Sequence, residues 1–412
     1  MADDDILPSG YAMYRTDPSD SFALKMLLPT PLKNALYEQR RRDALAAEAR
    51  SEAEQSVRAT PAPAPSVWTT QCSQQALLAK FDREILDRKR TRFHVVLQGD
   101  ELLRVAARVV TLRDRDYQKR ELEVLDKLKK LGPLREIVNP GFAPKGWRQS
   151  LAYLRHAYPH FQSVTDFVAG QVALSVRSKN PLSIPPIHLW GAPGLGKTHY
   201  ANDLARALGC PLRRQSMENA QTSALLLGTE RHWSTATFGV VFDQILLGNF
   251  ANPIFLIDEL DKAPRNSQYD PLAPLHSLLE PSTAVAVRDA AMDITFDASL
   301  AIFVATSNDP GKVPESLLSR FREFQIQSPN GEQALRAARV ISNSAISQLG
   351  IVGFKEPDFR IIKELAHLTA REITHAIRDA AARALQDGRL HLTLSDLAAD
   401  TCESDVPRRL VH

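Results

Sequence analysis

The segment GAPGLGKT, residues 191–198, constrains the fold of this chain more than any other feature. It matches the pattern G-x-x-x-x-G-K-[ST] at every fixed position. The apolar run IHLW precedes it, and HYANDLARALG after it has the spacing of a helix that ends at Gly209. A glycine-rich turn between a strand and a helix lets backbone amides converge on phosphate oxygens, and the helix start adds partial positive charge. The sequence therefore predicts a phosphate site on a strand–turn–helix unit.

Two side chains of this turn have distinct expected roles. Lys197 can reach the β- and γ-phosphates of a nucleotide, and the Thr198 hydroxyl can bind magnesium. A nucleotide with Mg²⁺ is therefore the predicted ligand. The residues expected to contact the nucleotide here are Gly191, Ala192, Pro193, Gly194, Leu195, Gly196, Lys197, Thr198 and His199.

A second apolar run, PIFLIDEL at residues 253–260, contains two adjacent acids. At the carboxyl end of a parallel strand both acids would face the ligand side of the sheet. Asp258 would then hold magnesium through water, and Glu259 would polarise the attacking water as a general base. The alternative is that these acids only cap the next helix. The phosphate turn upstream favours the catalytic interpretation.

Short apolar runs alternate with long helical stretches in the middle of the chain. IHLW, PIFLID and LAIFVAT have the composition of buried strands, and the segments between them have helical spacing. This rhythm is typical of a parallel sheet with covering helices. From about residue 330 onward only helices are expected. The predicted fold is thus an α/β core with a small all-α lid, preceded by a mainly helical N-terminal region.

The order of these motifs resembles the AAA+ class of P-loop ATPases, which implies ATP as the nucleotide. LAIFVATSND, residues 300–309, is similar to the third strand of that class, which implies that Asn308 positions the water near the γ-phosphate. PESLLSRF, residues 314–321, is similar to the stretch that carries the arginine finger, and Arg320 is its candidate. In that class the neighbouring subunit supplies the finger, where its charge stabilises phosphoryl transfer. The resemblance therefore implies a ring of this chain, with a hexamer as the expected size.

Within that class, the segment from Gly191 to about Ala399 resembles the ATPase portion of Lon-type proteins. LTAREITHAIRDAAARAL is similar to the family's helical lid, in which Arg371 matches the second sensor arginine. GTERHWSTATFGVVFDQI is similar to the segment with the pore loop that grips an unfolded polypeptide, and Trp233 lies at the aromatic position. The alternative for Trp233 is an ordinary packed surface aromatic. Lon-type proteases continue into a peptidase domain, whereas this sequence stops at His412, so we expect no intrinsic peptidase activity.

Composition changes along the chain predict four parts. TPAPAPS alternates proline with alanine, which is typical of a stiff linker between a charged helix and the next domain. The expected parts are a tail, charged helix and linker at 1–66, a helical basic region at 67–148, an AAA+ core at 149–328, and a helical lid with the C-terminus at 329–412.

The net charge of +3 hides a local excess in the second part. From Lys80 to Arg135 there are 16 Lys and Arg against 10 Asp and Glu. One interpretation is a surface for nucleic acid or an acidic partner. The other is a solvated helical face whose charges serve solubility. Interspersed acids and the lack of a recognised nucleic-acid motif favour the second interpretation.

Composition also predicts the compartment. The N-terminus MADDDILPSG is acidic where a secretory signal would be basic, and no apolar run approaches the length of a membrane helix. Three distant cysteines, Cys72, Cys210 and Cys402, indicate neither a disulfide framework nor a zinc site. A cytoplasmic protein without membrane partners is expected.

Three functions remain open at this stage. The first is a magnesium-dependent ATPase that forms a ring and unfolds or remodels protein substrates. The second is an ATPase acting on nucleic acid or a nucleoprotein complex through Lys80 to Arg135. The third is a nucleotide-switched scaffold without turnover, which the presence of Glu259, Asn308, Arg320 and Arg371 disfavours.

Overall fold

Contacts within the chain divide it into two compact units, Met1–Ser66 and Val67–His412. In the first unit, β1 (Tyr11–Arg15) and β2 (Lys25–Pro29) form an antiparallel pair, which no periodicity in the sequence predicts. Most of the expected charged helix and linker lies outside the described residues. The computed structural model describes residues 11–15, 25–29, 34, 38–39, 68, 71–87, 92–139, 146–220, 223–229, 236–264 and 270–397.

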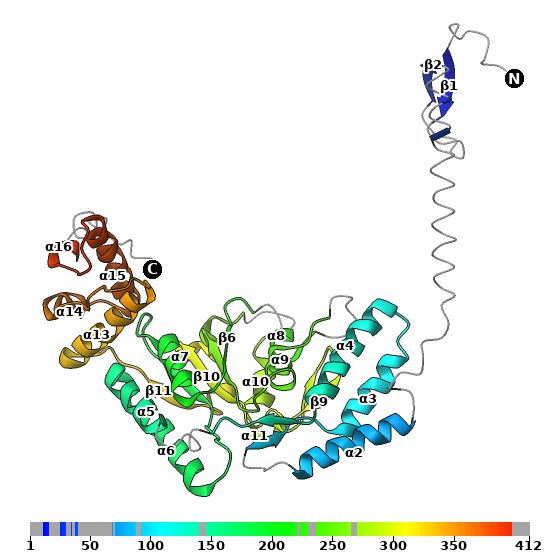
Figure 1. Cartoon of the computed structure of the whole chain (residues 1–412), viewed down its shortest axis with the longest axis horizontal. Helices are drawn as coiled ribbons and strands as arrows, with labels where there is room; N and C mark the ends of the chain where they lie inside the picture. The colour runs from blue at the N-terminus through cyan, green and yellow to red at the C-terminus, as the bar shows by residue number, and fades with distance from the viewer. Residues whose placement is uncertain are drawn as a thin grey trace. The chain divides into compact units, whose positions relative to one another are not determined.

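A five-stranded parallel sheet forms the centre of the second unit (Figure 1). Its strands lie in the spatial order β11-β5-β10-β7-β6, and every neighbouring pair is parallel. The strands are β5 (Ile187–Trp190), β6 (Leu212–Ser216), β7 (Ile254–Asp258), β10 (Ile302–Ser307) and β11 (Arg322–Gln325). Apolar runs in the sequence predict β5, β7 and β10. The other two strands lie at the sheet edges, where exposed positions carry the polar residues of LRRQS and REFQ.

Successive residues of the inner strands face opposite sides of the sheet, as strand geometry requires. Leu256 and Val304 enter one hydrophobic cluster, and Phe255 and Phe303 enter another. The first cluster contains α5 (Gly146–Ala157), α6 (Gln162–Ser178) and α7 (Lys197–Leu208). The second contains α9 (Val240–Leu246) and α10 (Ala273–Leu278), among others. The sheet is therefore covered by helices on both faces.

The N-terminal helices of this unit share the second cluster. Leu102 and Leu128 belong to the same buried set as Phe255. The elements concerned are α2 (Gln71–Asp87), α3 (Gly99–Val110), α4 (Arg115–Leu131), β3 (Phe93–Val95) and β4 (Leu134–Glu136). This region is thus packed onto the ATPase-like sheet and has no separate core of its own among the described residues.

Several basic residues of this region are used inside the fold. Arg135 is buried and donates to the Ile245 carbonyl at 3.1 Å, and burial lowers its pKa to about 10. Arg108 pairs with Glu121 at 3.0 Å and also donates to the Met292 carbonyl at 2.8 Å. That carbonyl lies in the hairpin of β8 (Val287–Asp289) and β9 (Ile294–Phe296), which lies beside α3 in Figure 1. Part of the local positive charge is therefore structural.

The C-terminal helices form a third hydrophobic cluster. Two of them begin with capping boxes, Asn330 with Gln333 and Thr369 with Glu372, which satisfy the free amides of the first turn. The helices are α13 (Gly331–Gln348), α14 (Phe359–Leu365), α15 (Ala370–Gln386) and α16 (Leu394–Leu397). The predicted fold class, a parallel α/β core with an all-α lid after a mainly helical region, is confirmed.

Short helical turns connect these larger elements. They are η2 (Pro159–Phe161), α8 (Ala224–Leu227), η3 (Leu260–Lys262), α11 (Pro281–Ala284), η4 (Pro310–Lys312) and α12 (Glu315–Leu318). Within the part of the chain that the structure describes, no helix combines the length and apolarity needed to cross a membrane.

Candidate nucleotide site

The carboxyl ends of the parallel strands bring the predicted motifs to one edge of the sheet. The register pairs Ser216 with Asp258, and Ser307 with Trp190. The phosphate turn follows Trp190 directly. A doubly wound sheet gathers its ligand at this edge, and the parallel topology places both the turn after β5 and the acids at the end of β7 there.

A pocket of about 330 Å³ lies at this edge between the core and the lid. The core contributes the turn, Arg214 of β6, the acids at the end of β7 and the end of β10, and the lid contributes the start of α15. Its lining residues are Pro193, Gly194, Leu195, Gly196, Lys197, Thr198, His199, Arg214, Asp258, Glu259, Thr306, Ser307, Asn308, Ala370, Arg371, Thr374 and His375.

Glycine is required in the turn by both conformation and space. Gly194 and Gly196 have φ of +83° and +85°, in the left-handed region that side chains disfavour. A Cβ on Gly194 would lie 3.0 Å from atoms of Thr369, the residue that caps α15. The Ala370 amide donates to the Gly194 carbonyl at 3.3 Å. The turn is thus shaped both to expose its amides and to contact the lid.

Lys197 connects the turn to the third predicted strand. Its ammonium donates to the carbonyls of Gly191 and Ala192 at 2.7 and 2.9 Å, and to Oδ1 of Asn308 at 3.0 Å. Burial lowers the pKa of Lys197, and the nearby Asp261 and Asp258 oppose that effect. The ammonium group is therefore held at the base of the turn and in contact with Asn308.

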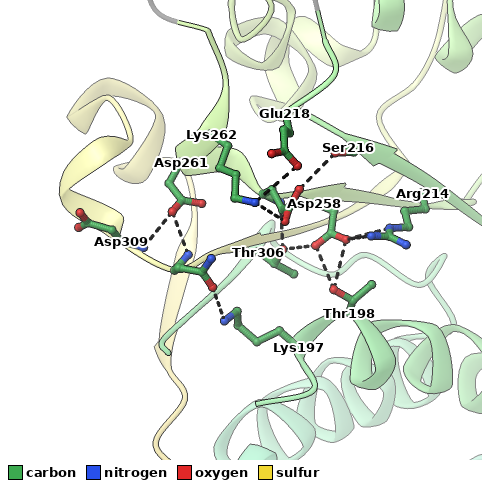
Figure 2. Close-up of polar contacts among 12 residues, drawn as sticks. Lys197, Thr198, Arg214, Ser216, Glu218, Asp258, Asp261, Lys262, Thr306 and Asp309 are labelled. Carbon is green, nitrogen blue, oxygen red and sulfur yellow. Dashed lines mark hydrogen bonds and ion pairs between the residues drawn. The ribbon is translucent and has the colours of Figure 1, made fainter. Parts of the chain in front are cut away.

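Asp258 lies at the centre of a network of hydroxyl donors (Figure 2). Thr198 Oγ1 lies 3.1 and 3.2 Å from its two carboxylate oxygens, and Thr306 donates to Oδ1. Mg²⁺ usually binds through one or two protein oxygens together with water and substrate phosphates. A hydroxyl and a carboxylate at this spacing, beside a phosphate turn, fit that requirement. The two residues predicted to hold magnesium are therefore brought together.

Glu259 has an unusual backbone and a fixed side chain. Its φ of +59° is left-handed, which is uncommon for a residue other than glycine and often marks functional sites. Lys262 donates to its carboxylate at 2.8 Å, and this contact lowers the pKa of Glu259. The same pair raises the pKa of Lys262, which Glu218 also contacts at 3.5 Å. The Glu259 carboxylate thus lines the pocket with a lowered pKa and a cationic partner.

The remaining predicted residues have different positions. Arg371 lines the pocket from the lid. Arg320 follows α12 and donates to the Ser316 carbonyl, and it is not among the described residues that line this pocket. Trp233 lies outside the described residues, so its role in a pore loop stays a prediction.

Three residues that contact this site were not predicted from the sequence. Arg214 comes from the polar edge strand β6, and its guanidinium contacts Asp258. Thr306 could have been found as a hydroxyl near the end of the third apolar run, two residues before Asn308. Lys262 could have been found only from its spacing of three residues after Glu259. The contact of Arg214 could be found only from the order of the strands, because β6 lies beside β7 only in the folded chain.

Comparisons with known proteins agree with this geometry. Residues 187–328 match the family described as "ATPase family associated with various cellular activities (AAA)". The Lon protease of Aster yellows witches'-broom phytoplasma is 29% identical over 243 residues, which cover 53% of this chain and 30% of that protein. Lon protease 2 of Thermus thermophilus is 31% identical over 232 residues, covering 52% and 28%. The peroxisomal Lon protease homolog 2 of Xenopus laevis is 29% identical over 214 residues, covering 52% and 24%.

The chain therefore spans less than a third of the length of each of these relatives. Among solved structures, a point mutant of Thermotoga maritima RuvB has a TM-score of 0.40 and 16% identity over 57% of this chain and 67% of that one, a likeness too low to establish a common fold. From the family match and the site together, the chain contains an AAA ATPase domain, with distant similarity to Lon proteases over about half of its length.

Proposed function

We propose that this protein is a Mg²⁺-dependent ATPase that works as a ring and unfolds or remodels polypeptides. The observation that carries the ATPase proposal is a single pocket lined by Lys197, Thr198, Asp258 and Glu259 from the core and Arg371 from the lid. Such a pocket brings together groups that can bind phosphate, groups that can bind a metal and a carboxylate that can act as a base. A separate helical lid closes one side of it. Phosphoryl transfer needs these groups because catalysis depends on positioning and charge neutralisation.

Each of these side chains then has a distinct role in hydrolysis. Lys197 and the amides of the turn bind the β- and γ-phosphates, while Thr198 and Asp258 hold Mg²⁺. When bound, Mg²⁺ neutralises charge on the phosphate oxygens. Glu259 orients a water and accepts its proton, and Lys262 keeps the Glu259 carboxylate ionised and in place. Asn308 reaches the same site from the end of β10.

The position of Arg320 supports the proposal of a ring. Its side chain lies outside the pocket of its own subunit, on the segment between α12 and β11. A guanidinium placed there would complete the pocket of a neighbouring subunit, where it would stabilise charge developing on the γ-phosphate. Arg371, on α15, would connect the bound nucleotide to the lid, so that hydrolysis changes the lid's position relative to the core. We therefore propose a hexamer of this chain.

A polypeptide is the substrate that the observations favour. The ATPase region is similar to Lon proteases, and three arginines of the basic region, Arg104, Arg108 and Arg135, make contacts inside the fold. Fewer cations of that region are then free for nucleic-acid phosphates. Binding that weakens steeply as salt rises would instead support the nucleic-acid alternative, because phosphate contacts release counterions.

The decisive experiment compares two site variants. Lys197→Ala should abolish ATP binding, whereas Glu259→Gln should bind ATP and lower hydrolysis by about 10²–10⁴-fold, because only the base is lost. Glu123→Gln, at an exposed position of α4, is the matched control and should hydrolyse ATP at the parental rate. Turnover at the parental rate by Lys197→Ala would contradict the assignment.

The Glu259→Gln variant, which should bind ATP without hydrolysing it, also tests the identity of the substrate and the formation of a ring. Glu259→Gln protein loaded with ATP should retain its partners during purification, and an unfolded polypeptide among them would support the proposal. Mixing Arg320→Ala subunits with Glu259→Gln subunits should restore part of the activity, because each supplies what the other lacks. No recovery in mixed assemblies would count against a finger supplied by the neighbour.

A further inference from the structure

The carboxylate predicted to hold Mg²⁺ already has a positively charged partner. Arg214 Nε and Nη2 lie 2.8 and 2.6 Å from Oδ2 of Asp258. The Asp258 side chain is buried, at 3% exposure, while that of Arg214 is 55% exposed and lines the same pocket. Figure 2 shows Arg214 and Thr198 approaching the carboxylate from different directions. Of the two partners in this ion pair, Arg214 is therefore the one that faces solvent.

The acceptor capacity of Asp258 is heavily used in this arrangement. Thr306 donates to Oδ1, Arg214 donates to Oδ2 through both Nε and Nη2, and the single hydroxyl proton of Thr198 is within reach of both oxygens. A carboxylate oxygen offers about two lone-pair sites. A cation that binds this carboxylate must therefore displace a donor. The two threonines are neutral, whereas the guanidinium repels an incoming cation. The departure of Arg214 therefore removes the largest electrostatic repulsion from the cation.

The position of Arg214 allows its side chain to leave Asp258 without disturbing the core. It lies on β6, an edge strand, and its exposed side chain can move into water without uncovering the hydrophobic core. The buried Asp258 carboxylate loses a charged partner when Arg214 leaves, and the incoming cation compensates that loss. A guanidinium keeps its charge at all ordinary pH. Arg214 can therefore make room for a cation only by moving away, since it does not lose its proton.

We propose that Arg214 is an exchangeable counter-ion of Asp258, which neutralises the buried carboxylate in the cation-free protein and gives way when Mg²⁺ enters with the nucleotide. This inference rests on the proposed function, since it assumes that Asp258 holds the metal. It adds a consequence: the nucleotide-free site discriminates against bare divalent cations, and the metal binds tightly only when phosphates supply further oxygens. Arg214 is thus a specificity-determining residue for the order in which metal and nucleotide bind.

Mn²⁺ provides a direct readout, because its binding to the full-length protein can be followed by electron paramagnetic resonance without turnover. Arg214→Gln should lower the dissociation constant of Mn²⁺ about tenfold, both alone and with ADP, because a charged donor no longer competes for Asp258. The adjacent exposed arginine of the same strand provides the matched control, Arg213→Gln, which should leave the constant unchanged. Unchanged or weaker Mn²⁺ binding by Arg214→Gln would overturn the proposal.

A second variant separates this inference from the function on which it rests. Asp258→Asn should abolish the Mn²⁺ signal. If it does and Arg214→Gln binds Mn²⁺ as the parent does, only the counter-ion proposal fails. If Asp258→Asn retains Mn²⁺, the metal assignment itself fails, and the counter-ion proposal fails with it. Thermal unfolding provides an independent measure, since Mn²⁺ with ADP should raise the melting temperature of Arg214→Gln more than that of the parent.

Discussion

His188 should control part of the dependence of stability on pH. It lies in β5, fully buried, with Nε2 2.8 Å from Ser307 Oγ. Burial lowers its pKa to about 4, while the charge of Asp261 opposes this effect and that of Lys197 adds to it. An unfolded histidine has a pKa of about 6.5, so the unfolded chain binds a proton that folded His188 does not bind between pH 4 and 6.5. Its contribution therefore lowers stability as pH falls through that window.

The contribution of His188 to the free energy of unfolding follows from the difference between its pKa values in the folded and the unfolded chain. It amounts to about 3 kcal/mol between the two ends of the window, as an upper figure. Asp289 has the opposite sign. Burial raises its pKa to about 6, so the folded protein binds more protons than the unfolded chain between about pH 4 and 6, and stability falls as pH rises. The two groups partly cancel in the parent protein, so its own pH profile conceals both.

The variant His188→Gln removes one of the two contributions. Urea unfolding of parent and variant at several pH values from 4 to 7 should show a stability difference that shifts in favour of the parent by about 3 kcal/mol as pH rises. His156→Gln, at an exposed position of α5, is the matched control for the substitution itself. A constant difference for His188→Gln across the window would refute the reasoning, because it would mean that His188 titrates alike in both states.

Three further outcomes are expected. Asp289→Asn should produce the opposite trend, with the variant gaining about 3 kcal/mol on the parent between about pH 4 and 6 in the same assay. Gly191→Ala should cost at least about 2 kcal/mol in urea unfolding, because φ is +152° and a Cβ would lie 2.3 Å from a backbone carbonyl oxygen; Gly170→Ala, where nothing lies within 4 Å, should not destabilise. Arg108→Met should cost about 3–5 kcal/mol by leaving the Glu121 carboxylate buried without this ion pair, and Arg108→Met with Glu121→Leu should recover most of that loss.

Local patterns were sufficient where one short segment contains all the necessary information. The phosphate turn requires glycines at fixed spacing between a strand and a helix, and Gly194 and Gly196 have the positive φ that this shape needs. The strands β7 and β10 are buried along their whole length, so they appear as continuous apolar runs. The edge strands β6 and β11 escaped prediction because one exposed side admits polar residues.

The sequence by itself determined the phosphate turn, the acid pair of Asp258 and Glu259, and the change from an α/β core to an all-α lid. Only the tertiary structure decided that Arg214 neutralises Asp258, that Lys262 holds Glu259, and that the basic N-terminal helices share a core with the sheet. The physical reason is that periodicity records how far each residue is buried. The identity of the partner that buries or pairs with it depends on strand order and helix packing, which join segments far apart in the chain.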